Sequence, residues 1–247
     1  MRRAPIIAPL RHLAMVSFAV PPERVHTYIP EGFELDLRHD ASGTPWALVS
    51  AVMFENQQTG PSAPMLRFLR ATFAQVNYRT YVRRAGSAGA WFFKVVMGTR
   101  QAEVQRRLFH APTYSAPITL RHEWDAARRT YRTYRFDCTA SPHRLSAELA
   151  GEDAQLAPGA LFESAGEMTE WLTMRPDGYF HDPRARQISS MPVRHEAMKP
   201  AAARVIGFSA DVLEQLGVVP LAEQARPYAA FFQPTIDLFG EYPRRLA

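Results

Sequence analysis

The chain contains very little cysteine and very little lysine. Cys138 is the single cysteine among 247 residues, so the sequence excludes an intramolecular disulfide and a zinc site built from several cysteines. We interpret Cys138 as a small core residue, because it lies in a strand-like run, and a reducing cytoplasm suits such a chain. Only two of the 29 basic residues, Lys94 and Lys199, are lysines, so each of them deserves separate consideration.

The sequence also lacks the motifs of several common enzyme classes. Its eight histidines show neither HxH nor HExxH spacing, so we expect no metal site and no cofactor. The patterns GxGxxG, GxxxxGK[ST] and GxSxG are absent as well. Nucleotide-binding folds and serine hydrolase chemistry therefore have no support in the sequence.

Long apolar runs and dense clusters of positive charge are missing too. No apolar stretch approaches the roughly 20 residues that a membrane helix needs, and the N-terminal arginines and prolines do not form a signal peptide. The net charge is +5, but the arginines are scattered singly or in pairs. A nucleic-acid-binding stripe would interleave them with exposed aromatics. We therefore expect neither a membrane nor a nucleic acid as a partner.

What the chain does contain is a series of short apolar segments separated by turns. Hydrophobic residues make up 47% of it, and its 20 prolines are spread throughout, which favours short elements around a sizeable core in one domain over residues 1–247. Predicted strands cover 12–20, 33–37, 46–54, 73–84, 90–97, 118–124, 130–138, 145–149, 187–196, 203–208 and 227–239. Predicted short helices cover 21–29, 65–71, 101–108, 164–175 and 209–216. The predicted fold class is α+β, mainly antiparallel β.

The strongest local signal is a long β-hairpin over residues 72–99. From Phe73 to Arg84 the side chains alternate between two rows, which indicates a strand with two different faces. Residues 84–89 (RAGSAG) supply the small residues of a hairpin loop. The returning segment 90–97 (AWFFKVVM) is apolar in both rows, so we expect a strand buried on both faces, away from any sheet edge.

The pairing within this hairpin decides which side chains share a face. A four-residue loop over 85–88 would pair Arg84 with Gly89 and Arg79 with Lys94. That register gathers five polar side chains on one face between aromatic residues: Gln75, Asn77, Arg79, Tyr81 and Lys94. A slip of one residue would move Lys94 to the other face.

Polar groups that converge among apolar neighbours indicate a small-molecule site. Arg79 is the first candidate anchor, because its planar guanidinium group suits a carboxylate or a phosphate, and we expect a small acidic ligand. The expected ligand-binding residues are Arg79, Gln75, Asn77, Tyr81, Trp91 and Phe93. The alternative is that the polar row faces solvent, or that Arg79 forms a structural pair with an acidic residue.

Three residues are candidates for catalysis: Lys94, Tyr114 and His110. A lysine beside Arg79 would lose its proton more easily and could attack a carbonyl carbon, although its amine could instead extend to solvent. Tyr114, like Tyr81, could hydrogen-bond a ligand or act as a general acid, and Tyr114 could equally be a packed core ring. His110, like His195, is an acid–base candidate or a loop residue.

Several segments together resemble a bacterial family. FAQVNYRTYV at 73–82, followed by GAWFF at 89–93, resembles the central motif of the YqjF-like proteins, the domain of unknown function 2071. Further segments resemble other parts of that family in the same order: VPP at 20–22, IPEG at 29–32, RLFHAPTY at 107–114, LTMRPDGY at 172–179 and VRH at 193–195. The resemblance covers nearly the whole chain.

This family is similar to acetoacetate decarboxylase in fold. The resemblance implies a cone-shaped antiparallel β-barrel with a central pocket and a few flanking short helices, and it favours an inward-facing polar row. Proteins of this type often self-associate, so a homo-oligomer is compatible with the resemblance.

The chemistry of acetoacetate decarboxylase is not expected to carry over. That enzyme forms a Schiff base on a lysine that follows Gly-Phe-Pro, but the matching stretch here, residues 109–114, has no lysine. Gln75 stands where the resemblance places a pocket glutamate. Two functions stay open: an enzyme acting on a small oxo- or hydroxy-carboxylic acid, and a non-catalytic binder of a small acidic or apolar ligand.

Overall fold

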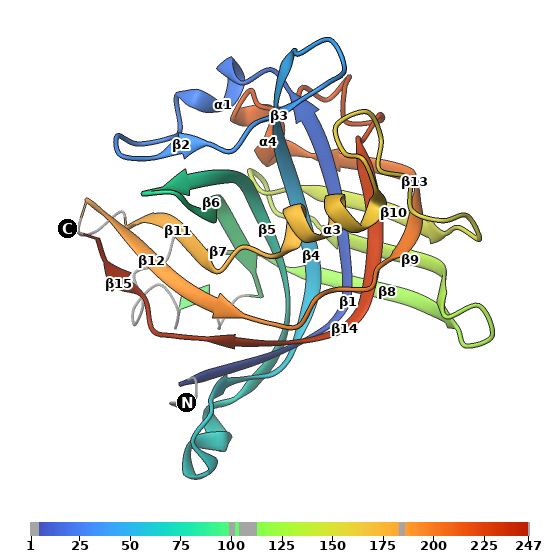
Figure 1. Ribbon diagram of the computed structural model, residues 1–247. Coiled ribbons are helices and arrows are strands. Elements are labelled where there is room, and N and C mark those ends of the chain that lie inside the picture. The colour runs from blue at the N-terminus through green and yellow to red at the C-terminus, as the bar shows by residue number, and fades with distance from the viewer. Residues whose placement is uncertain (1–4, 99–101, 104–112, 183–185, 247) are drawn as a thin grey trace.

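The computed structural model describes residues 5–98, 102–103, 113–182 and 186–246, and strands dominate it (Figure 1). The strands are β1 (Ile6–Val20), β2 (Glu34–Leu35), β3 (Arg38–His39), β4 (Pro45–Pro61), β5 (Ala71–Arg84), β6 (Ser87–Met97), β7 (Thr113–Ser115), β8 (Ile118–Asp125), β9 (Thr130–Cys138), β10 (Leu145–Gly151), β11 (Asp177–Asp182), β12 (Gln187–Arg194), β13 (Ala201–Ala210), β14 (Ala229–Gly240) and β15 (Arg244–Arg245). The helices are α1 (Glu23–His26), the 3₁₀ helix η1 (Pro64–Leu69), α3 (Ala165–Thr173) and α4 (Asp211–Gln215). The expected helix at 101–108 lies mostly outside the described residues.

The strands pair mainly in antiparallel fashion, as the sequence predicted. The order is β15-β12-β11-β6-β5-β4-β1-β14-β13-β10-β9-β8, and the parallel exceptions are the pairs of β6 with β11 and with β7. β12 also pairs with β14, through Val193 opposite Gly240 and Arg194 opposite Phe239. The path through β1, β4, β5, β6, β11, β12 and β14 therefore returns to its starting strand.

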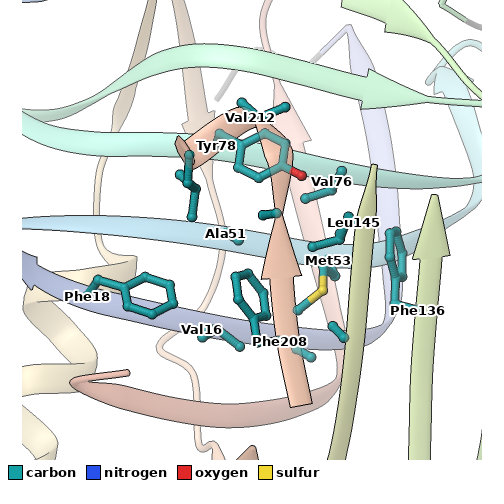
Figure 2. Close-up of a cluster of buried hydrophobic side chains, with 14 of the residues drawn as sticks. Val16, Phe18, Ala51, Met53, Val76, Tyr78, Phe136, Leu145, Phe208 and Val212 are labelled. Atoms are coloured by element: carbon teal, nitrogen blue, oxygen red, sulfur yellow. The ribbon is translucent and has the colours of Figure 1, made fainter. Parts of the chain in front are cut away.

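Strands β1, β4 and β5 pack against other elements on both of their faces. One face packs against α3 through Met168 and Leu172, and we refer to it as the α3 side. The other packs against β9, β10 and β13, and we refer to it as the β9 side; Figure 2 shows Phe136 and Phe208 in this larger cluster. Cys138 lies in the same cluster and is 2% exposed, which confirms the prediction of a core cysteine.

Helix α3 begins where the sequence predicted. Its N-cap is Ser164, whose side chain accepts a hydrogen bond from the backbone N–H of Glu167, and this satisfies one of the unpaired N–H groups of the first turn. Glu167 also accepts from the backbone N–H of Glu163 and forms an ion pair with Arg38 of β3. These contacts hold the helix so that its last turn lies over β5.

A half-buried histidine in β1 makes the stability of the fold depend on pH. His12 occupies a bulge with φ of 52°, its ring stacks on His122 at 3.8 Å, and its Nδ1 lies 2.9 Å from the hydroxyl of Tyr131. Burial lowers the pKa of His12 from 6.5 to about 4, and the charges of His122 and Arg11 act in the same direction. Between these two values the unfolded chain binds more protons, so stability falls as the pH drops from 6.5 toward 4.

We predict that replacing His12 by asparagine flattens this dependence. Asparagine tolerates the left-handed backbone of the bulge but does not titrate. Allowing for half-burial, we expect the wild type to lose about 1 to 2 kcal/mol more than the variant between pH 7 and pH 4.5. Urea unfolding at both pH values measures the difference. Equal losses in the two proteins would contradict the assignment.

Candidate functional site

Strand β5 separates polar from apolar side chains, as its sequence predicted. Tyr81 packs on the α3 side with Leu172, whereas Val76 and Tyr78 pack on the β9 side. Because side chains alternate along a strand, Gln75, Asn77 and Arg79 face the same way as Tyr81. The polar row therefore runs along the α3 side of β5.

The predicted pairing of β5 with β6 was wrong. The loop has two residues, Ala85 and Gly86, and both have positive φ, at 47° and 81°. Such a turn matches the twist of the flanking strands, and it pairs Arg84 with Ser87. In β6, Phe93 is an extra residue between the pairs Arg79–Phe92 and Tyr78–Lys94. This bulge shifts the register by one residue and reverses the faces of the strand beyond it.

The register places Lys94 on the opposite face from Arg79. Lys94 pairs with Tyr78 and therefore shares the β9 side. Trp91 pairs with Thr80 and packs with Val82 and Tyr179, and Phe93 meets the ring of Tyr28 at 5.6 Å. The residues opposite Arg79 and Tyr81 are instead Phe92 and Ala90. The expected site thus divides into two groups, one on each face of the sheet.

On the α3 side, Arg79 reaches the end of α3. Its Nη2 donates to the backbone oxygen of Leu172 at 3.0 Å, while its Nε is buried without a hydrogen-bond partner. Among the described residues, no carboxylate lies within 4 Å of its guanidinium group. A cation at a helix C-terminus interacts favourably with the helix dipole, which explains part of this placement.

A second arginine, Arg175, approaches the same place. It is 5% exposed, its Nε donates to the oxygen of Trp171 at 2.6 Å, and its Nη1 lies 2.5 Å from the carboxylate of Asp36. Its Nη2 is buried without a partner. Burial lowers the pKa of Arg175, the bond to Asp36 opposes this effect, and the charge of Arg79 adds to it. The sequence interpretation did not single out Arg175, although it lies in the segment 172–179 that carries the family resemblance.

Tyr81 lies close to both cations. The Cζ atoms of Arg79 and Arg175 are 5.6 Å and 5.0 Å from the centre of its ring, within the range of cation–π attraction. Its hydroxyl lies 2.7 Å from that of Ser50, which in turn lies 2.7 Å from that of Ser17. Both serines are fully buried, so this chain of hydroxyls fixes the position of the ring.

The amides of the polar row bond to one another. Gln75 accepts from Asn56 at 3.0 Å and donates to Asn77 at 2.6 Å, and Thr59 donates to Asn56 at 3.3 Å. This network fixes the orientation of the Gln75 and Asn77 amides along β5. His195 has a structural environment, because its ring nitrogens lie at the backbone oxygens of Thr173 and Glu196.

On the β9 side, the structure brings Lys94 and Tyr114 together and adds His143. The Nζ of Lys94 lies 4.9 Å from the centre of the Tyr114 ring, which lies 4.9 Å from that of His143. His143 follows β9 in a turn that no sequence motif indicated. His110 lies outside the described residues.

Candidate metal-ligand clusters and candidate membrane-spanning helices are both absent from the described residues. No three His, Cys, Asp or Glu side chains within them are grouped so as to hold a metal ion. None of the helices in the same part of the chain has the length and apolar character to cross a membrane.

Solved structures with this fold are distant in sequence. An acetoacetate decarboxylase-like enzyme from Sphingomonas wittichii RW1 has a TM-score of 0.62 at 15% identity, covering 98% of this chain and 93% of its own. Acetoacetate decarboxylase from Legionella pneumophila has a TM-score of 0.64 at 10% identity, covering 99% and 88%. The enduracididine biosynthesis enzyme MppR, complexed with pyruvate, has a TM-score of 0.60 at 11% identity, covering 100% and 92%. These likenesses establish an acetoacetate decarboxylase-like fold.

Sequence comparison adds the family. No curated protein matches the chain. Residues 8–237, however, match the profile of a family described as an uncharacterized conserved protein. Since the match spans nearly the whole chain, the protein belongs to the family called domain of unknown function 2071.

Proposed function

We propose that the protein binds a small carboxylic acid on the α3 side of β5, with Arg79 as the anchor and Arg175 beside it. The observation that carries the proposal is that two guanidinium groups lie near one tyrosine ring, each with a buried nitrogen that lacks a partner. Asp36 pairs with Arg175, which leaves Arg79 as the uncompensated charge. The Nε of Arg79 is buried, and burying part of a charged group without a partner is costly; a carboxylate would supply that partner through two parallel hydrogen bonds.

The proposed ligand site is the interior of a cone-shaped barrel. The closed path of strand pairing, with the polar row on its α3 side, supports this arrangement. Gln75, Asn77 and Tyr81 would then line the pocket beside the arginines, with Phe92 in the place expected for Trp91 and Phe93. The similar fold of MppR, complexed with the small oxo-acid pyruvate, supports the ligand class.

Of the two open functions, the geometry favours the binder. An enzyme acting on an oxo- or hydroxy-carboxylic acid needs a catalytic group beside the anchored acid. The two catalytic candidates within the described residues, Lys94 and Tyr114, lie on the other face of the sheet from Arg79. The other lysine, Lys199, is exposed. A Schiff base next to the acid is therefore not supported. We further propose a cytoplasmic location, because the single buried cysteine suits a reducing compartment.

A thermal-shift screen against small carboxylates, oxo-acids and sugar acids tests the proposal. Ligand at about 100 times its dissociation constant adds about 2.7 kcal/mol of stability. We expect at least one acid to stabilise the wild type and the shift to disappear in Arg79→Ala. Arg204→Ala is the matched control, since Arg204 is an exposed arginine on β13. A shift that is unchanged in Arg79→Ala, or absent for every acid, would remove Arg79 as the anchor.

A further inference from the structure

Lys94 has an unusual setting for a lysine. It is half-buried on the β9 side, and among the described residues no carboxylate lies within 4 Å of its amine. Burial lowers the pKa of Lys94. Lys199, the other lysine of the chain, is exposed and has no such environment. Of the two lysine amines, one is therefore half-buried and the other is exposed.

Two of the described side chains near Lys94, Tyr78 and His143, carry no negative charge at neutral pH. Tyr78, directly opposite in the hairpin, has a buried hydroxyl without a partner, and burial raises the pKa of that hydroxyl, so it stays protonated. Figure 2 shows Tyr78 extending from β5 into the apolar cluster. His143 is 8% exposed, its Nδ1 lacks a partner, and burial and the charge of Lys94 both lower its pKa, so it is neutral.

Tyr114 lies between the amine of Lys94 and the surface of the molecule. Its ring contacts both Lys94 and His143, and it is 42% exposed, so the group lies at the surface rather than deep in the core. The cation–π contact with Tyr114 favours the protonated amine, whereas the loss of hydration disfavours it. Among the described residues no carboxylate holds the proton of Lys94, so desolvation is the larger effect, as in other lysines activated by apolar surroundings.

We propose that Lys94, with Tyr114 and His143, forms a second site that captures a small aldehyde or ketone as an imine. The lone pair of the neutral amine attacks the carbonyl carbon, a C–N bond forms, and the former amine protons pass to the carbonyl oxygen. That oxygen leaves as water when the C=N bond forms. No oxidant or metal is needed. This site lies on the opposite face of the sheet from Arg79 and does not depend on acid binding there.

Reductive trapping tests the proposal and uses Lys199 as an internal reference. The folded protein is treated at pH 7 with propionaldehyde, or separately with pyruvate, in the presence of cyanoborohydride, which reduces an imine to a stable secondary amine. Peptide mass spectrometry then assigns the label. We expect the peptide with Lys94 to be labelled several-fold faster than that with Lys199, and the N-terminal amine is scored on its own peptide.

Two controls show whether the faster labelling of Lys94 depends on the folded structure or on its local sequence. In urea, where the chain is unfolded, the preference for Lys94 over Lys199 should disappear. In Lys94→Met, a substitution of similar length, label should remain only at Lys199 and the N-terminus, with folding checked by circular dichroism. Labelling of Lys199 at or above the rate of Lys94 in the folded wild type would overturn the proposal. A preference for Lys94 that persists in urea would overturn it equally.

Discussion

Replacing Arg175 by methionine is expected to lower the free energy of unfolding by about 3 kcal/mol, because removing one partner of a buried ion pair leaves the other charge uncompensated. The side chain of Asp36 is only 12% exposed, and its short contact with Arg175 would be lost. Among the described residues, Arg83 is the other cation within 4 Å of Asp36, but it is 3.8 Å away and exposed. Methionine fills much of the vacated volume between Tyr81 and Trp171, so charge rather than packing dominates the loss.

Urea unfolding of three variants measures this effect. Arg83→Ala is the matched control, and it should cost less than about 1 kcal/mol because Arg83 is an exposed partner of the same carboxylate. Combining Arg175→Met with Asp36→Leu removes both buried charges, and we expect it to recover much of the stability. If Arg175→Met alone stayed within about 1 kcal/mol of the wild type, the ion pair would not be a significant support of the fold.

Local features of this chain could be predicted from sequence because they depend on neighbouring residues. The alternation of polar and apolar side chains along β5 indicates that its two faces differ in polarity. The structure places the polar row on the α3 side. Ser164 and Glu167 lie three residues apart and begin α3 as predicted. In both cases, the spacing of side chains along the backbone is enough to predict the local structure.

The register of the hairpin could not be predicted in the same way. Its two-residue turn places Ala85 in the left-handed region, which residues with a Cβ rarely adopt, so the sequence favours a longer loop. The bulge at Phe93 allows the ring to pack against Tyr28, more than 60 residues earlier in the chain. Contacts with distant elements therefore decide which face Lys94 occupies.

The composition of the site depends even more strongly on distant contacts. Arg175 and Asp36 are 139 residues apart in the sequence, and only the path of α3 over β5 brings them together beside Arg79. His143 likewise joins Lys94 through the packing of the β9–β10 turn near β7. Composition indicated that arginine and lysine mattered, but not which of them would be neighbours.

Replacing Gly89 by alanine is expected to destabilise the protein by about 2 kcal/mol, the typical cost of an added methyl group in a packed position. Gly89 pairs in parallel with Asp177 at the start of β11. A Cβ at Gly89 would overlap the ring of Tyr179 and lie 2.9 Å from the backbone oxygen of Asp177. The ring could rotate, but the oxygen cannot move without displacing β11.

Displacement of β11 would also shift Arg175 in the proposed acid site, because β11 follows Arg175 after a single proline. We therefore expect Gly89→Ala to weaken acid binding as well as stability. Gly207→Ala is the matched control: Gly207 also lies in a strand, nothing lies within 4 Å of its added Cβ, and stability should stay within about 0.5 kcal/mol. Urea unfolding measures the stability of each variant. Titration with the acid identified by thermal shift measures its binding affinity. A loss of stability with undiminished binding would place the acid away from Arg175, whereas unchanged stability would show that β11 accommodates the methyl group.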